Sequence, residues 1–184
     1  MQRNTKGTLS LAKVGAGRQR FGGECTHNGA TTVSAGILQV DGSFTQSAVT
    51  VAEGATLAGV GSFGKAVTLA DGAKLEVGSA KLEAEDSEMN LDAGITLQGN
   101  SAFTFKALDR SGVASVSASS FSGAGTVTVN VDAALQSGEY LLVKSDAAIP
   151  FTYAKGSNCG ALEFRNEGTE LWMTKNGGLS IIVR

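Results

Sequence analysis

A tandem repeat over residues 47–78 constrains the fold more than any other feature of the chain. Residues 49–57 read Val-Thr-Val-Ala-Glu-Gly-Ala-Thr-Leu, and residues 67–75 read Val-Thr-Leu-Ala-Asp-Gly-Ala-Lys-Leu, so the sequence numbers differ by 67 − 49 = 18. Each unit combines short alternating strands with a glycine turn, and one such unit cannot bury its apolar face alone. The repeat therefore predicts an all-β solenoid in which successive units stack.

The same unit recurs on both sides of this repeat. Its leucines are Leu38, Leu57, Leu75 and Leu97, and their numbers increase by 19, then 18, then 22. A glycine precedes each leucine, and glycine adopts φ > 0 at a tight corner without steric cost. We therefore expect four equivalent corners, at Gly36, Gly54, Gly72 and Gly94.

Apolar residues within one period come in three short bursts, as at residues 75–77, 82–84 and 89–91. This pattern predicts three short strands per coil of about 18–22 residues, each pairing with its counterparts one coil before and after. Side chains at alternate positions would point inward and form ladders. The predicted ladders are Val49 with Val67, Val51 with Leu69 and Leu91, and Leu38 with Leu57, Leu75 and Leu97.

Two segments break the period within the predicted solenoid, which we place at residues 1–149. Residues 12–29 hold five glycines, with Phe21 as the one large apolar residue, and we expect a long loop or irregular first coil there. Residues 81–90 carry Leu82 and Met89 with acidic residues between them. A helix needs an apolar stripe at i, i+3 and i+4, so a strand and an acidic loop are favoured over a helix.

The character of the chain changes from Pro150. Strand-like runs at residues 161–164, 171–174 and 179–183 are joined by turn sequences at 166–168 and 175–178, and Asn-Gly in the second is a strong turn signal. Four aromatic residues lie in this part: Phe151, Tyr153, Phe164 and Trp172. A solenoid end exposes its core and its strand edges, so we expect residues 150–184 to form an aromatic β-hairpin cap in the same structural unit.

Charge and composition limit the partners. Fifteen Lys and Arg against seventeen Asp and Glu give a net charge of −2, which does not predict binding to nucleic acid or to an anionic membrane. One basic cluster, Lys13, Arg18 and Arg20, is interpreted as a solvated first turn of the fold. No apolar run is long enough for a membrane-spanning helix. No signal peptide opens the chain, so we expect any export signal to lie outside it, and the early repeat sequence suggests an excised piece.

Metal and disulfide chemistry are weakly supported. The chain has one histidine, His27, and two cysteines, Cys25 and Cys159, which several coils would separate, so we predict two free thiols and no zinc site. A cluster of acidic residues within 83–88 has the chemistry for calcium but lacks the glycine and the fixed spacing of a calcium loop. A solvated loop is favoured for its members, Glu83, Glu85, Asp86 and Glu88.

Catalytic constellations are also missing, and we expect no catalytic, cofactor-binding or metal-binding residues. A Ser/His/Asp or Cys/His site would have to use His27 in the irregular segment. A polysaccharide lyase or glycosidase on a β-helix is the alternative, and it needs carboxylates with Arg or Lys converging on one sheet face. Glu76, Gln98 and Ala58, taken as equivalent ladder positions, do not build such a row.

Three sequence patterns resemble a known family. They are Gly-Thr-Leu-Ser-Leu at residues 7–11, Thr-Thr-Val-Ser-Ala-Gly-Ile-Leu-Gln-Val at 31–40, and the two Val-Thr-Val/Leu units with Gly-Ala-X-Leu. Residues 31–78 look like the autotransporter-associated β-strand repeat, the passenger-associated transport repeat. The segment between the Gly-Thr-Leu and Thr-Thr-Val strands is longer here than in that family.

The resemblance implies a right-handed parallel β-helix in an exported bacterial protein, secreted or at the cell surface on the outer membrane. Such passengers are adhesins, stalks or carriers of separate enzymatic domains, and the repeat itself carries no catalytic residues. We therefore expect a structural or adhesive segment. Its exposed Thr, Ser and Ala ladders suit repetitive hydrogen bonding to a glycan or a surface protein, and they suit a passive rod equally well. Any specific binding site should lie where the repeat is broken: residues 12–29, residues 83–88 or the aromatic end.

Overall fold

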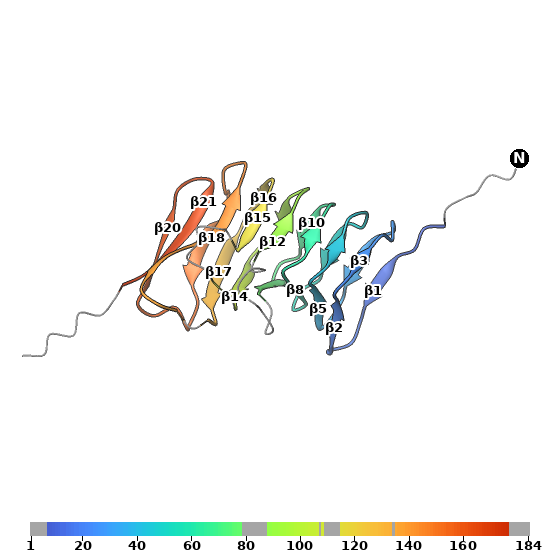
Figure 1. The fold of residues 1–184 in the computed structure, drawn as a ribbon, viewed down its shortest axis with the longest axis horizontal. Coiled ribbons are helices and arrows are strands. Elements are labelled where there is room, and N and C mark those ends of the chain that lie inside the picture. Colours follow the sequence, from blue (N-terminus) through green and yellow to red (C-terminus); the bar gives the residue numbers. More distant parts are fainter. Residues whose placement is uncertain (1–6, 79–87, 107, 109–114, 134, 177–184) are drawn as a thin grey trace, which may run out of the picture.

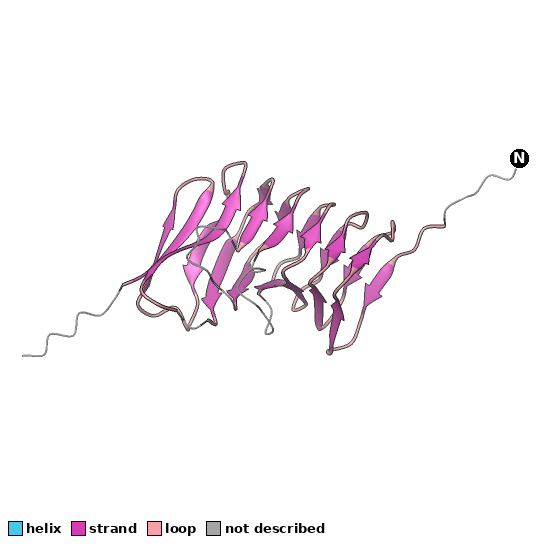
Figure 2. Ribbon diagram, viewed as in Figure 1, coloured by secondary structure: helices cyan, strands magenta, loops and turns pink. Residues whose placement is uncertain are grey.

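The computed structural model describes residues 7–78, 88–106, 108, 115–133 and 135–176 of the chain. These residues form 21 β-strands and contain no helix, which confirms the all-β prediction. The strands stack along the long axis of the molecule (Figure 1), and the described loops between them are drawn in pink (Figure 2). The arrangement is compatible with a solenoid, since consecutive strands from β1 to β18 enter three different sheets in turn.

The three sheets contain six, seven and eight strands. Sheet A consists of β1 (Leu11–Lys13), β4 (Thr31–Val33), β7 (Val49–Val51), β10 (Val67–Leu69), β13 (Ile95–Leu97) and β16 (Phe121–Gly123). Sheet B consists of β2 (Arg18–Phe21), β5 (Ile37–Val40), β8 (Thr56–Gly59), β11 (Lys74–Val77), β14 (Ser101–Phe105), β17 (Thr126–Val131) and β19 (Thr152–Lys155). All pairings in these two sheets are parallel.

Sheet C has six strands in parallel and two that are antiparallel. The parallel strands are β3 (Glu24–Cys25), β6 (Ser43–Phe44), β9 (Ser62–Phe63), β12 (Met89–Leu91), β15 (Val116–Ala118) and β18 (Gly138–Ser145). The strands β20 (Leu162–Asn166) and β21 (Glu170–Lys175) form an antiparallel hairpin, and β21 joins β18. Hereafter a strand triplet means three consecutive strands, one from each sheet, beginning with β1–β3.

The predicted ladders are correct through the tandem repeat and wrong after it. Val49 lies beside Val67, Val51 beside Leu69, and Leu38, Leu57 and Leu75 follow one another in register. After Leu75 the next member is Phe103. Leu97 instead lies beside Leu69, and Leu91 beside Phe63.

These errors have one cause, a change in the period. Val49 pairs with Val67, a step of 67 − 49 = 18, whereas Val67 pairs next with Ile95, a step of 95 − 67 = 28. The added residues lie between sheets B and C: two residues separate β8 from β9, and eleven separate β11 from β12. The period of about 18–22 residues leads from Leu75 in sheet B to Leu97, but Leu97 lies in sheet A because of these added residues.

Three of the four predicted corners are equivalent. Gly36, Gly54 and Gly72 each connect a strand of sheet A to one of sheet B, with φ between 70° and 75°, where a β-carbon would be strained. Gly94 also has a positive φ, of 79°, but it lies between β12 of sheet C and β13 of sheet A. The prediction that Gly94 is a fourth equivalent corner is therefore wrong, and the changed period is again the reason.

The prediction of a long loop or irregular coil at residues 12–29 is wrong. This segment contains β2 and β3, which pair in parallel with β5 and β6, while β1 pairs with β4. Its glycines and charged residues concealed the regular strands β2 and β3, whose inward apolar residues are Phe21 and Cys25.

The core is one continuous cluster of ladder residues along the stack. Sheet C contributes Phe44 and Phe63, which are in register with ring centroids 6.0 Å apart. At the other end Phe151 packs edge-to-face against Phe103 and Phe121, at 6.1 and 5.3 Å. Parallel stacking continues past residue 149 into β19, and the predicted strand at 179–183 lies outside the described residues.

Candidate functional site

A column of hydroxyl side chains runs along the outward face of sheet A. Each strand of this sheet from β4 to β16 contributes its central residue, while the residues on either side point into the core in β4, β7, β10 and β13. The members, in register from strand to strand, are Thr32, Thr50, Thr68, Thr96 and Ser122. We call this set the hydroxyl column.

The sequence produces this column in a simple way. Alternation of apolar and hydroxyl residues puts one face of each strand in the core and leaves threonine on the other. Threonine suits the exposed face of a strand because its branched β-carbon favours extended backbone, and Thr–Thr pairs across strands are favourable. At the end of the column the hydroxyls of Thr96 and Ser122 are hydrogen-bonded at 2.8 Å.

The chemistry of the column is uncharged and repetitive. Each hydroxyl is both a donor and an acceptor, and parallel strands repeat it at about 4.8 Å. Thr32, Thr50 and Ser122 are exposed, and Thr68 and Thr96 are half-buried. Such a surface is able to exchange hydrogen bonds with a long ligand that itself carries hydroxyl or amide groups at regular intervals.

A second cluster, of opposite charges, lies on sheet B. Arg18 donates from Nη1 to Gln39 Oε1 and from Nη2 to Glu76 Oε1, both at 2.9 Å. Glu76 Oε1 is also 3.2 Å from Lys106 Nζ. These contacts join β2 to β11, although β5 and β8 lie between these two strands in the sheet. A further ion pair beside them joins Arg20 Nε to Asp41 Oδ2 at 2.5 Å.

The charged surroundings set the protonation of Glu76. Its burial raises the pKa, but hydrogen bonds and charges from Arg18 and Lys106 together outweigh this effect and hold the pKa below its usual value of 4.5. Glu76 is therefore ionised at neutral pH and forms a structural ion pair. Only 15% of its side chain is exposed.

The charged cluster bears on the enzymatic alternative. Glu76 is level with Ala58 and Thr104, so the predicted equivalence with Gln98 is wrong. Two carboxylates and three cations do gather on sheet B, but Glu76 and Asp41 are both ion-paired. Neither carboxylate lines the three cavities described for this chain, of about 480, 360 and 320 Å³.

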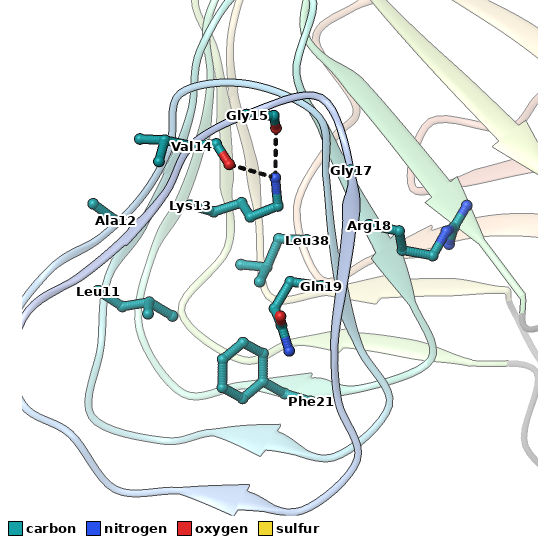
Figure 3. Close-up of a pocket in the computed structure, with 10 residues that line it drawn as sticks. All are labelled: Leu11, Ala12, Lys13, Val14, Gly15, Gly17, Arg18, Gln19, Phe21 and Leu38. Atoms are coloured by element: carbon teal, nitrogen blue, oxygen red, sulfur yellow. Dashed lines mark hydrogen bonds between the residues drawn. The ribbon is translucent and has the colours of Figure 1, made fainter.

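Two of these cavities open on the first strand triplet. The larger, about 480 Å³, is lined by Leu11, Phe21 and Leu38 together with the polar side chains of Lys13 and Gln19. Figure 3 shows the Lys13 amine turned toward the carbonyls of Val14 and Gly15, while Arg18 points away from the cavity. The cavity is thus an open end of the core with a mixed apolar and polar lining.

Cys25 and His27 line the second cavity, of about 360 Å³, which lies at the same end. The His27 ring packs edge-to-face on Phe44 with centroids 5.1 Å apart, and its Nε2 is 2.8 Å from Thr31 Oγ1. Thr31 is in turn hydrogen-bonded to Ser47, so the imidazole belongs to a buried polar network. In the described part of the chain no three His, Cys, Asp or Glu side chains are grouped to hold a metal.

The acidic cluster at residues 83–88 and the two cysteines are the remaining predicted features. Glu83, Glu85 and Asp86 lie outside the described residues, and Glu88 is half-buried just before β12. Cys25 and Cys159 are free, as predicted. The thiol of Cys159 is buried near the third cavity, about 320 Å³, and donates to the carbonyl of Val129 at 3.0 Å.

Sequence reasoning missed the cross-strand partners of the basic cluster. Arg18 and Glu76 are far apart in the sequence, so their contact depends on the register of four strands. A signal for sheet C was present and overlooked: Gly-Ser-Phe occurs at residues 42–44 and again at 61–63, where β6 and β9 form.

Comparison with known proteins adds no identity to these observations. No family model matches the chain, and no curated protein matches it. Within the described ranges no helix is both long and apolar enough to cross a membrane.

Proposed function

We propose that this chain is a structural or adhesive segment of an exported bacterial surface protein, similar to an autotransporter passenger, and that the hydroxyl column contacts a glycan or a surface protein. The fold proposed for it is a right-handed parallel β-helix with three short strands per coil and a C-terminal β-hairpin cap. The observation that carries the proposal is the hydroxyl column, one outward residue per strand from Thr32 to Ser122.

The column supports binding rather than a purely passive rod for a geometric reason. Its members share one register, so a ligand with a regular repeat meets the same group at each step. Because the strands are fixed by core ladders on their other face, little side-chain or backbone freedom is lost on binding. Neutral hydroxyls also suit neutral glycans, whose recognition does not require a charged site.

The alternative, a carbohydrate-active enzyme, has weaker support. A glycosidase requires two carboxyl groups with different protonation states and access to the scissile bond. Here Glu76 is held ionised by Arg18 and Lys106, and Asp41 is paired with Arg20. These contacts favour a structural role for the charged cluster.

A glycan array probed with the purified chain tests the proposal. The column variant replaces Thr50 and Thr68 with lysine, and the matched control replaces Ser62 and Asn90 with lysine on the outward face of sheet C. We expect the column variant to lose binding at least about tenfold while the control retains it, because bulky charges interrupt the contact surface.

Two outcomes would contradict the proposal. Equal binding by the column variant and the wild type would remove the hydroxyl column as the contact surface. Release of sugar fragments from a polysaccharide, lost on the Glu76→Gln substitution, would establish the enzymatic alternative instead.

A further inference from the structure

The first strand triplet has open strand edges. Among the described residues β1, β2 and β3 each pair with a single neighbour, and each lies at the end of its sheet. Unpaired backbone groups on such edges are templates for pairing with another chain. Leu9 and Val14 beside them are 67% and 69% exposed, so this end also offers apolar contact.

Two inward positions of this triplet are polar where deeper triplets are apolar. Lys13 takes the ladder position of Val33, Val51, Leu69 and Leu97. Gln19 takes that of Leu38, Leu57, Leu75 and Phe103. A charged residue at an inward position of an edge strand disfavours edge-to-edge pairing, because a strand stacked on β1 would close the cavity that Lys13 lines and remove its remaining contact with water.

Lys13 is accommodated by its own surroundings. Its ammonium group donates to the carbonyls of Val14, Gly15 and Ala35 at 3.0, 2.7 and 3.0 Å. The residue is only 9% exposed. Three acceptors match the three donors of an ammonium group, so the charge is stable at the end of the core.

The two arginines of the basic cluster hold the same triplet from outside. Arg18 binds Gln39 and Glu76, and Arg20 binds Asp41. The Arg18 contact to Glu76 extends across β5 and β8 to β11. All three cations are therefore engaged within the chain. The interpretation of this cluster as a solvated first turn is wrong for Lys13, which is buried, and is correct for Arg18 and Arg20, whose side chains are exposed.

We propose that the first strand triplet resists self-association of this chain: Lys13 disfavours pairing of the β1–β3 edges with a second copy, and Arg18 and Arg20 fasten the triplet to the stack. This inference is independent of the hydroxyl column. It concerns self-association, and it gives the basic cluster a role that glycan or protein binding does not use.

Sedimentation velocity over a range of concentrations tests the role of Lys13. Lys13→Met keeps an unbranched side chain of nearly the same length and removes its charge, and Lys65→Met is the control at an exposed lysine. We expect the wild type and the control to remain monomeric and Lys13→Met to self-associate. Two results would overturn the proposal. One is a folded Lys13→Met protein that sediments as the wild type does, and the other is a wild-type protein that self-associates through its β1–β3 edges.

The arginine pair keeps the proposal testable if Lys13→Met does not fold. Arg18 and Arg20 have side chains that are 39% and 57% exposed, so the double alanine variant should fold. We expect amide hydrogen exchange in β1–β3 to accelerate about tenfold, with exchange in β14 and β17 unchanged. Wild-type exchange rates in β1–β3 of this variant would contradict the fastening role.

Discussion

The two ends of the stack are closed by different kinds of interaction. At the C-terminal end the last ladder positions and the adjoining turns are apolar and buried, with Phe151 at 4%, Leu162 at 8% and Cys159 at 0% exposure. At the N-terminal end Leu11 and Phe21 are half-buried, and the polar contacts of Lys13 and Arg18 take over. One repetitive core is therefore closed by buried apolar side chains at its C-terminal end and by polar and charged contacts at its N-terminal end.

This difference follows from what lies beyond each last strand. The hairpin β20–β21 supplies Leu171 and Met173, which are at most 1% exposed, and the segment before it supplies Cys159. In the described part of the chain, Leu11 and Phe21 of β1 and β2 are only half-buried. Lys13 and Gln19 take the next inward positions, where polar side chains tolerate contact with water better than apolar ones do.

The largest effect should come from breaking the C-terminal end. Phe151→Ala removes a ring that packs against Phe103 and Phe121, and deletion of a buried phenylalanine costs about 3–5 kcal/mol. Urea denaturation should show this loss in the free energy of unfolding. A cost below about 1 kcal/mol would mean that burial does not hold this end.

The matched change at the N-terminal end should cost less. Phe21 is half-buried and packs edge-to-face on Phe44 at 5.5 Å. Phe21→Ala should therefore reduce the free energy of unfolding by about 1–2 kcal/mol, since less apolar surface is lost from the core. A cost equal to that of Phe151→Ala would abolish the contrast between the two ends.

Acid should loosen the N-terminal end before the C-terminal end. The folded pKa of Glu76 lies below its usual 4.5, so its ion pairs stabilise the folded chain above the unfolded pKa. That contribution is lost as the pH falls through the folded pKa. Hydrogen exchange in β2 should therefore accelerate several-fold in acid relative to β17, and Glu76→Gln should remove this difference. An acid effect that persists in Glu76→Gln would assign it to another group.

The smallest effect should come from the C-terminal ion pairs. Arg165 lies 3.4 Å from Glu139 and 2.7 Å from Glu167, but about half of each side chain is exposed. Exposed pairs contribute little because water screens them, so Arg165→Ala should change the free energy of unfolding by less than about 1 kcal/mol. Thermal denaturation in low and high salt would detect a larger, salt-dependent contribution if this expectation were wrong.

The fold was predictable where the period was constant. Val49 and Val67, or Leu57 and Leu75, share a ladder because identical spacing puts identical residues in one position. The predicted ladder of Leu97 is wrong because the longer connection between β11 and β12 changes the count without changing the local pattern. Local sequence predicts strands, whereas register depends on connection length.

The charged features were predictable in composition and not in arrangement. Lys13, Arg18 and Arg20 are visible as a basic cluster in the sequence. Lys13 finds two of its acceptors next to it in the chain, at Val14 and Gly15. The distant partners of the cluster are Ala35, Gln39, Asp41 and Glu76, which only the stacking brings close. The hydroxyl column lies between these extremes, because Thr50 and Thr68 follow from the repeat and Ser122 does not.

The uneven connections between sheets B and C have a consequence for how such a chain accepts new sequence. Two residues join β2 to β3, β5 to β6 and β8 to β9, whereas eleven join β11 to β12 and ten join β14 to β15. Strand pairing continues in register on both sides of the longer connections. The connection from sheet B to sheet C therefore tolerates different lengths, because the strands on both sides of it keep their ladder partners.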